Sequence, residues 1–139
     1  MPRTALKFGL LFIGIAAIII GLMFTALGVS TTGRIFNAIL SVIHDGGAIQ
    51  GLDTPNADSE LRFYSVIFIG YGIIMVQTAQ NLSRHIARVP FLLLLFFGGG
   101  TARLISLIMT GPPHSLFILL MGIELILPVL LGLCYLRAK

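Results

Sequence analysis

The chain has 139 residues, of which 57% are hydrophobic and 10% are charged, and its mean hydropathy is +1.03. Soluble globular domains carry about a quarter charged residues, so this composition excludes a soluble domain and indicates an integral membrane protein. The net charge of +4 comes without a basic patch interleaved with aromatic residues, so we expect no nucleic-acid partner. The single Cys134 excludes an internal disulfide bond and a CxxC redox centre.

Apolar segments long enough to cross a membrane follow one another along the chain. About 20 helical residues span the roughly 30 Å hydrocarbon layer. Backbone groups in lipid must bond within their own segment, which favours helices. The sequence therefore predicts an all-α polytopic membrane protein with a single domain over residues 1–139. Its antiparallel four-helix bundle would use residues 5–29, 61–80, 89–110 and 115–136.

The first apolar segment also has features of a signal peptide. Arg3 and Lys7 precede it, and small residues follow it in TALGVS. The apolar core of a signal peptide is about 7 to 15 residues long, which is shorter than this segment. We therefore predict a retained transmembrane helix.

The first connection, residues 30–60, contains the amphipathic stretch RIFNAILSVIHD. Arg34, Asn37 and Ser41 recur at helical spacing, and aliphatic residues occupy the other side. This pattern predicts a short helix in the membrane interface or across the end of the bundle. After it, Asp58, Ser59 and Glu60 are predicted as cap and first-turn residues of the second transmembrane helix.

Basic residues mark one side of the membrane. They are Arg3, Lys7, Arg84, Arg88 and Arg137, whereas the acidic residues of segment 30–60 lie on the other side. The positive-inside rule then predicts that both termini are cytoplasmic. We expect the inner membrane of a bacterium, with the first connection in the periplasm.

Two ionisable residues, Arg103 and Glu124, lie well inside predicted transmembrane helices, and Arg62 lies at the border of one. At 1.5 Å per residue, Arg103 lies about 10 Å and Glu124 about 13 Å below the outer surface. The short turn GPPHS makes their helices neighbours, so we predict an ion pair between them. Because Pro128 has no N–H, the carbonyl of Glu124 would also be left without its helical donor.

Residues near this pair suggest a polar pocket on the periplasmic side. Arg62 could turn inward beside Glu124 or extend to the membrane surface. The other candidate ligand-binding residues are Tyr64, Tyr71 and Ser106. Ionisable residues inside membranes are usually functional. A purely structural pair that fixes helix register is the alternative interpretation.

The sequence contains no motif for a metal, a cofactor or a catalytic centre. His44, His85 and His114 lie in connections or at helix ends, so no intramembrane histidine pair could ligate a haem. Neither HExxH nor GxSxG occurs. We therefore expect no metal, no cofactor and no catalytic residue.

Three stretches resemble a known family: ELRFYSVIFIGYG, GGGTARLISLIMTGPPHSLF and MGIELILP. They are similar to an uncharacterised domain-of-unknown-function family of small bacterial four-helix membrane proteins, and more distantly to the DoxX-like group. The shared elements are Arg62, the Gly100 and Arg103 element, the turn at Gly111, and Glu124. The family implies no activity, whereas the DoxX-like resemblance implies a membrane subunit of an oxidoreductase complex.

These observations predict a non-enzymatic bundle that binds a lipophilic molecule, such as a lipid or a quinone, or a membrane partner. Arg103 would bind an anionic or carbonyl group, and Glu124 would orient it. The alternatives are a small proton-coupled transporter that acts as a homo-oligomer with Glu124 as proton carrier, and the oxidoreductase subunit. An enzyme of membrane lipid chemistry has only Arg103 and Glu124 in its favour.

Overall fold

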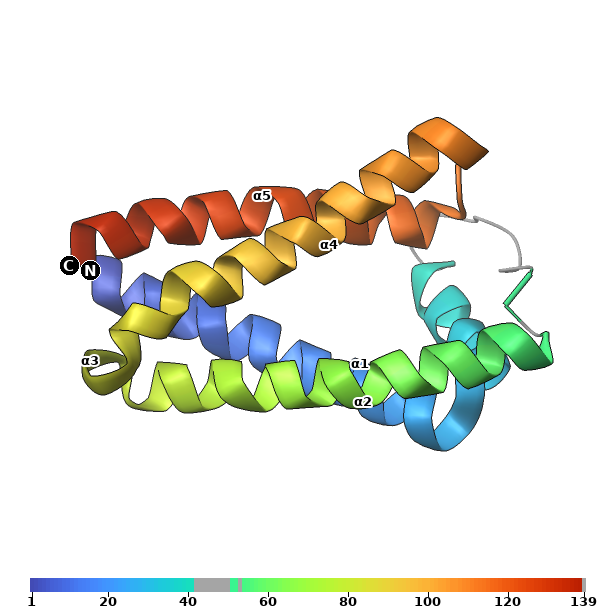
Figure 1. Cartoon of the computed structure of the whole chain (residues 1–139), viewed down its shortest axis with the longest axis horizontal. Helices are drawn as coiled ribbons and strands as arrows, with labels where there is room; N and C mark the ends of the chain where they lie inside the picture. The colour runs from blue at the N-terminus through green and yellow to red at the C-terminus, as the bar shows by residue number, and fades with distance from the viewer. Residues whose placement is uncertain (42–50, 53, 139) are drawn as a thin grey trace.

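The computed structural model describes residues 1–41, 51–52 and 54–138, and these are helical apart from short connections (Figure 1). Four of its helical stretches are long and apolar enough to cross a membrane, which confirms the predicted all-α multi-pass membrane protein. The two chain termini lie together at one end, here called the termini end, and the start of α2 and the α4–α5 connection lie at the other, here called the connection end. The elements are α1 (Pro2–Leu40), α2 (Pro55–Gln80), α3 (Leu82–His85), the 3-10 turn η1 (Ile86–Arg88), α4 (Val89–Thr110) and α5 (Ser115–Ala138).

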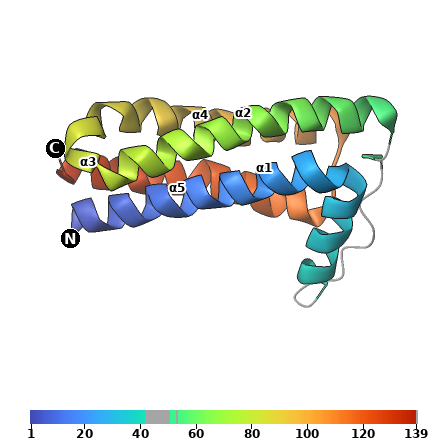
Figure 2. The same cartoon turned by 90° about the horizontal axis from the view of Figure 1, so that it is seen from below.

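Helix α1 is longer than the predicted first span and is broken at Gly28, whose φ of 76° and ψ of 171° are not helical. The following segment, residues 29–40, turns away from the bundle axis (Figure 2). It contains the described part of the predicted amphipathic helix, and it follows the first span directly where the sequence suggested a loop. Residues 42–50 of that stretch lie outside the described part of the chain.

Helix α2 begins at Pro55, earlier than the predicted start at residue 61. The Oγ1 of Thr54 accepts a hydrogen bond of 3.3 Å from the N–H of Ala57, which caps the helix. Pro55 at the first helical position lacks only an N–H that would have no helical partner. The cap is therefore Thr54 and none of the predicted residues 58–60, whereas Asp58 does supply the predicted acid in the first turn.

Small residues let α1 and α2 approach closely along their length. A Cβ built on Gly72 would lie 2.6 Å from the carbonyl oxygen of Gly14, and one on Gly14 would lie 2.9 Å from that of Gly72. Two helical turns further along α1, a Cβ on Gly21 would lie 2.9 Å from the carbonyl oxygen of Ser65. Close backbone packing of this kind holds helices together in lipid, where no hydrophobic effect drives their association.

The bundle has a densely packed half and a hollow half. Helix α1 packs most extensively on α2 and also on α5, α4 packs on α5, and α2 and α4 touch only sparsely. This confirms that α4 and α5 form the predicted antiparallel hairpin. The dense half lies toward the termini end, and its core cluster consists of Leu6, Leu10, Ile13, Met75, Ala79, Val89, Leu92, Leu93 and Leu131.

Candidate functional site

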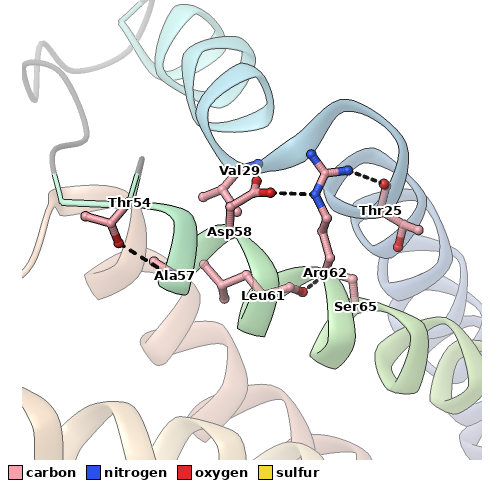
Figure 3. Close-up of polar contacts among 8 residues, drawn as sticks. All are labelled: Thr25, Val29, Thr54, Ala57, Asp58, Leu61, Arg62 and Ser65. Carbon is pink, nitrogen blue, oxygen red and sulfur yellow. Dashed lines mark hydrogen bonds and ion pairs between the residues drawn. The ribbon is translucent and has the colours of Figure 1, made fainter.

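An ion pair on α2 replaces the hydrogen bond that α1 loses at its break (Figure 3). In an unbroken helix the N–H of Val29 would donate to the carbonyl of Thr25. Here the N–H of Val29 donates to Oδ1 of Asp58 at 3.1 Å, and Nη1 of Arg62 donates to the carbonyl of Thr25 at 2.7 Å. Nε of Arg62 also donates to Oδ2 of Asp58 at 2.7 Å. The N–H of Val29 and the carbonyl of Thr25, which lack their helical hydrogen bond, thus each have a side-chain partner.

The signs of the charges match the two helix ends that they meet. The carboxylate of Asp58 lies at the N-terminus of segment 29–40, and the guanidinium of Arg62 lies at the C-terminus of the preceding helical part. Each charge thus faces the helix-dipole end of opposite sign. A Cβ on Gly28 would collide with Nη2 of Arg62, so only glycine leaves room for this contact. We call Gly28, Asp58 and Arg62 the break clamp.

The position of Arg62 differs from the pocket role that the sequence suggested. Its side chain is held by Asp58 and by the carbonyl of Thr25, and it does not line the cavity described below. An acceptor four residues earlier on the same helix and an open carbonyl on α1 are nearer partners than Glu124. Arg62 therefore stabilises the junction of α1 and α2.

The predicted ion pair between Arg103 and Glu124 is present. Nε of Arg103 donates to Oε2 of Glu124 at 2.8 Å across the α4–α5 contact. Gly100 permits this approach, since its Cβ would lie 2.9 Å from Cβ of Glu124 and 2.9 Å from Cγ of Leu125. The guanidinium also lies over the ring of Phe117, with Cζ 5.6 Å from the ring centroid, a cation–π contact.

This ion pair forms part of the wall of a cavity of about 360 Å³ in the hollow half of the bundle. Six of the ten phenylalanines in the chain line it, so aromatic side chains from all four long helices contribute to the wall. Arg103 and Glu124 supply its only charged side chains among the described residues. The phenylalanines are Phe12, Phe24 and Phe36 of α1, Phe68 of α2, Phe96 of α4 and Phe117 of α5.

Arg103 keeps donors for a further partner. Its side chain is 38% exposed, whereas that of Glu124 is only 12% exposed. A guanidinium carries five N–H donors, and the bond to Glu124 engages Nε. In the described part of the chain, neither Nη group donates to another residue. The pair can therefore present the two Nη groups, with four N–H donors, to a molecule in the cavity while Glu124 fixes the orientation of the arginine.

Tyr71 lies behind the cavity wall. Its hydroxyl donates to the carbonyl of Leu92 at 2.8 Å, which ties α2 to α4. Its ring stacks on Phe68 and on Phe96, with centroid distances of 6.2 and 6.5 Å. Both of these phenylalanines line the cavity, whereas Tyr71 does not. The structure gives Tyr71 a supporting position where the sequence suggested a lining residue.

Tyr64 and Ser106 lie away from the cavity. The side chain of Tyr64 is 57% exposed and makes an edge contact with the ring of Phe63. Ser106 is exposed on α4, where its hydroxyl lies 3.4 Å from that of Thr110. Of the candidate ligand-binding residues, only Arg103 and Glu124 are brought together at the cavity.

Among the described residues, no group of three or more His, Cys, Asp or Glu could hold a metal ion.

The break clamp and the aromatic wall were not predicted from the sequence. The signal for the clamp was the seven-residue spacing of Gly14, Gly21 and Gly28, which places all three glycines on one face of a helix. The wall had no comparable signal, because its phenylalanines come from helices that are far apart in the sequence.

These features define a small multi-pass membrane protein of four helices with an aromatic cavity between them. The chain belongs to the family described as Domain of unknown function (DUF4345), which it matches over residues 5–135. No curated protein and no solved structure matches it.

Proposed function

We propose that the protein binds one lipophilic molecule that has an anionic or carbonyl head group. The observation that carries this proposal is the arginine with free Nη donors in the wall of an aromatic cavity. A volume of about 360 Å³ lies within the range of roughly 300 to 1,000 Å³ that small-molecule sites occupy. Arg103 binds the head group, Glu124 orients Arg103, and the phenylalanines contact a ring or an isoprenoid-like chain, as a lipid or a quinone would offer.

The proposal includes the orientation of the chain in its membrane. The start of α1, which carries Arg3 and Lys7, and the turn formed by α3 and η1, which carries Arg84 and Arg88, lie at the termini end. The positive-inside rule then favours a cytoplasmic position for this end. The cavity then opens in the opposite half of the bilayer. In a bacterial inner membrane that half faces the periplasm.

Geometry favours binding over the alternative of proton-coupled transport. A carrier must expose its site to each side of the membrane in turn. Glu124 lies on the cavity, but the half of the bundle toward the termini end is filled by the core cluster. Proton transport would require this packed half to open, whereas binding uses the cavity as it stands.

Native mass spectrometry after mild extraction tests the proposal. Wild-type protein is expected to retain a small molecule of defined mass, and Arg103→Ala is expected to lose it. Arg34→Ala is the matched control, because Arg34 is exposed on segment 29–40 and does not line the cavity. Ala16→Leu provides a second route, since Ala16 lines the cavity and the larger side chain would occupy it while leaving the ion pair intact.

Two outcomes would contradict the proposal. Bare wild-type protein after mild extraction would show that nothing is held tightly. Equal retention by wild type, Arg103→Ala and Ala16→Leu would place the bound molecule elsewhere on the protein.

A further inference from the structure

A second site lies at the termini end, outside the cavity of the proposed function. It is a groove of about 690 Å³ between the start of α1 and the turn from α2 into α3. Three cations line it: Arg3 and Lys7 from α1, and Arg84 from α3. We call this the basic groove. Its wall also contains Phe8, Leu11, Ala79, Gln80, Asn81 and Ser83.

We propose that the basic groove binds the head group of an anionic phospholipid, with the phosphate between Arg3, Lys7 and Arg84. Arg3 and Lys7 are four residues apart on α1, so they project from one face of the helix. Arg84 comes from the facing wall. An anion between them is attracted from both sides of the groove.

The three cations have no carboxylate partner within the described chain. Its two ion pairs join Arg62 to Asp58 and Arg103 to Glu124, and neither belongs to this groove. Basic residues that served only to set the orientation of the protein in the membrane could lie anywhere around the bundle at this end. Here they converge on one concave surface, which matches the basic pockets between transmembrane helices that bind lipid head groups.

Apolar residues in the same groove favour a lipid over a free anion. Phe8 is 65% exposed, and Leu11 continues the same face of α1 toward the bilayer interior. Residues 7 and 11 are about 6 Å apart along a helix axis. A phosphate beside Lys7 would therefore place its acyl chains against Phe8 and Leu11. The amide side chains of Gln80 and Asn81 can donate to the glycerol and phosphate oxygens.

The test compares two lipids with identical acyl chains, phosphatidylglycerol and phosphatidylcholine, added to delipidated protein and counted by native mass spectrometry. Wild-type protein is expected to retain one phosphatidylglycerol and to prefer it at least about tenfold. Lys7→Gln with Arg84→Gln is expected to weaken this binding about 25-fold, since each cation near an anionic lipid surface contributes about fivefold. Arg88→Gln with Arg137→Gln is the matched control, because it removes the same charge from exposed residues that do not line the groove.

Equal retention of both lipids, or an equal loss in the control variant, would overturn the proposal. A further arm adds sodium phosphate without lipid, which is expected to leave the melting temperature unchanged. Stabilisation by phosphate equal to that by the lipid would assign the groove to a free anion and overturn the lipid proposal. Salt provides a test that needs no variant. Retention of phosphatidylglycerol should fall as the salt concentration rises, while retention of phosphatidylcholine stays constant. Retention of phosphatidylglycerol that does not change with salt would contradict an electrostatic site.

Discussion

The guanidinium of Arg62 donates to the carbonyl of Thr25, the acceptor that α1 leaves without a helical donor at its break. The same side chain holds Asp58, which accepts the N–H of Val29 on the far side of the break. One ion pair on α2 therefore replaces one missing backbone bond on α1. Removing Asp58 leaves the N–H of Val29 without this acceptor, and removing Arg62 leaves the carbonyl of Thr25 without this donor.

Gly28→Ala is expected to destabilise the protein. The φ of 76° at this position is unfavourable for a side chain, and the added Cβ would collide with Nη2 of Arg62. We expect a loss of about 1 to 3 kcal/mol in unfolding free energy, measured as a lower melting temperature in detergent. Gly98→Ala is the control, because that glycine is helical and faces open space. A Gly28→Ala protein as stable as the control would disprove the role of the break clamp.

Arg62→Lys is expected to destabilise the protein although the charge is kept. Arg62 uses Nε for Asp58 and Nη1 for Thr25, and the single ammonium of lysine cannot reproduce this planar geometry. Thermal unfolding is the measurement, with Arg34→Lys as the control on the exposed surface of segment 29–40. If both variants melt with the wild type, a positive charge near Asp58 is sufficient and the directed bonds are not needed.

Gly100→Ala and Gly99→Ala, one residue apart, should differ clearly in their effects. A Cβ on Gly100 would lie 2.9 Å from Cβ of Glu124, whereas one on Gly99 would lie 3.9 Å from its Oε2. Overpacking of this kind costs about 1 to 3 kcal/mol. Gly100→Ala should therefore lower the melting temperature and weaken retention of the bound molecule, and Gly99→Ala should do neither. Equal melting temperatures for the two variants would show that α5 can shift away without cost.

Tyr71→Phe separates support of the cavity wall from contact with a ligand. Loss of the hydrogen bond to the carbonyl of Leu92 is expected to cost about 0.5 to 1.5 kcal/mol. The ring remains between Phe68 and Phe96, so native mass spectrometry should still show the bound molecule. Tyr64→Phe is the control and should change neither quantity, because Tyr64 is exposed. If Tyr71→Phe lost the bound molecule at unchanged stability, Tyr71 would have to be assigned to the binding site and not to its support.

The pair of Arg103 and Glu124 could be predicted from the sequence because its geometry is local to one hairpin. The GPPHS turn makes α4 and α5 antiparallel neighbours, and the helical rise then gives the depth of each residue. The partner of Arg62 could not be predicted in the same way. It depends on a backbone carbonyl that becomes available only because Gly28 leaves the helical conformation inside an otherwise continuous apolar run.

A pocket beside Arg103 and Glu124 was predicted from the sequence, but its aromatic lining was not. Its position depends on the sparse contact between α2 and α4, and on phenylalanines from four helices that point to the same space. Apolar residues on a transmembrane helix give no periodic signal that separates a cavity wall from a face toward lipid, because both are hydrophobic. Tyr64 and Tyr71 show the difficulty, since one faces outward and the other lies behind the wall.

The contacts between α1 and α2 recur at intervals of seven residues on both helices: residues 14, 21 and 28 face residues 72, 65 and 58. One residue inserted between 21 and 28 would rotate Gly28 by about 100° around the helix axis and carry it away from Asp58. An insertion of seven residues in each helix would bring the facing pairs back into register. The place where α1 bends is thus specified by the neighbouring helix, and a change in the length of one is tolerated only with a matching change in the other.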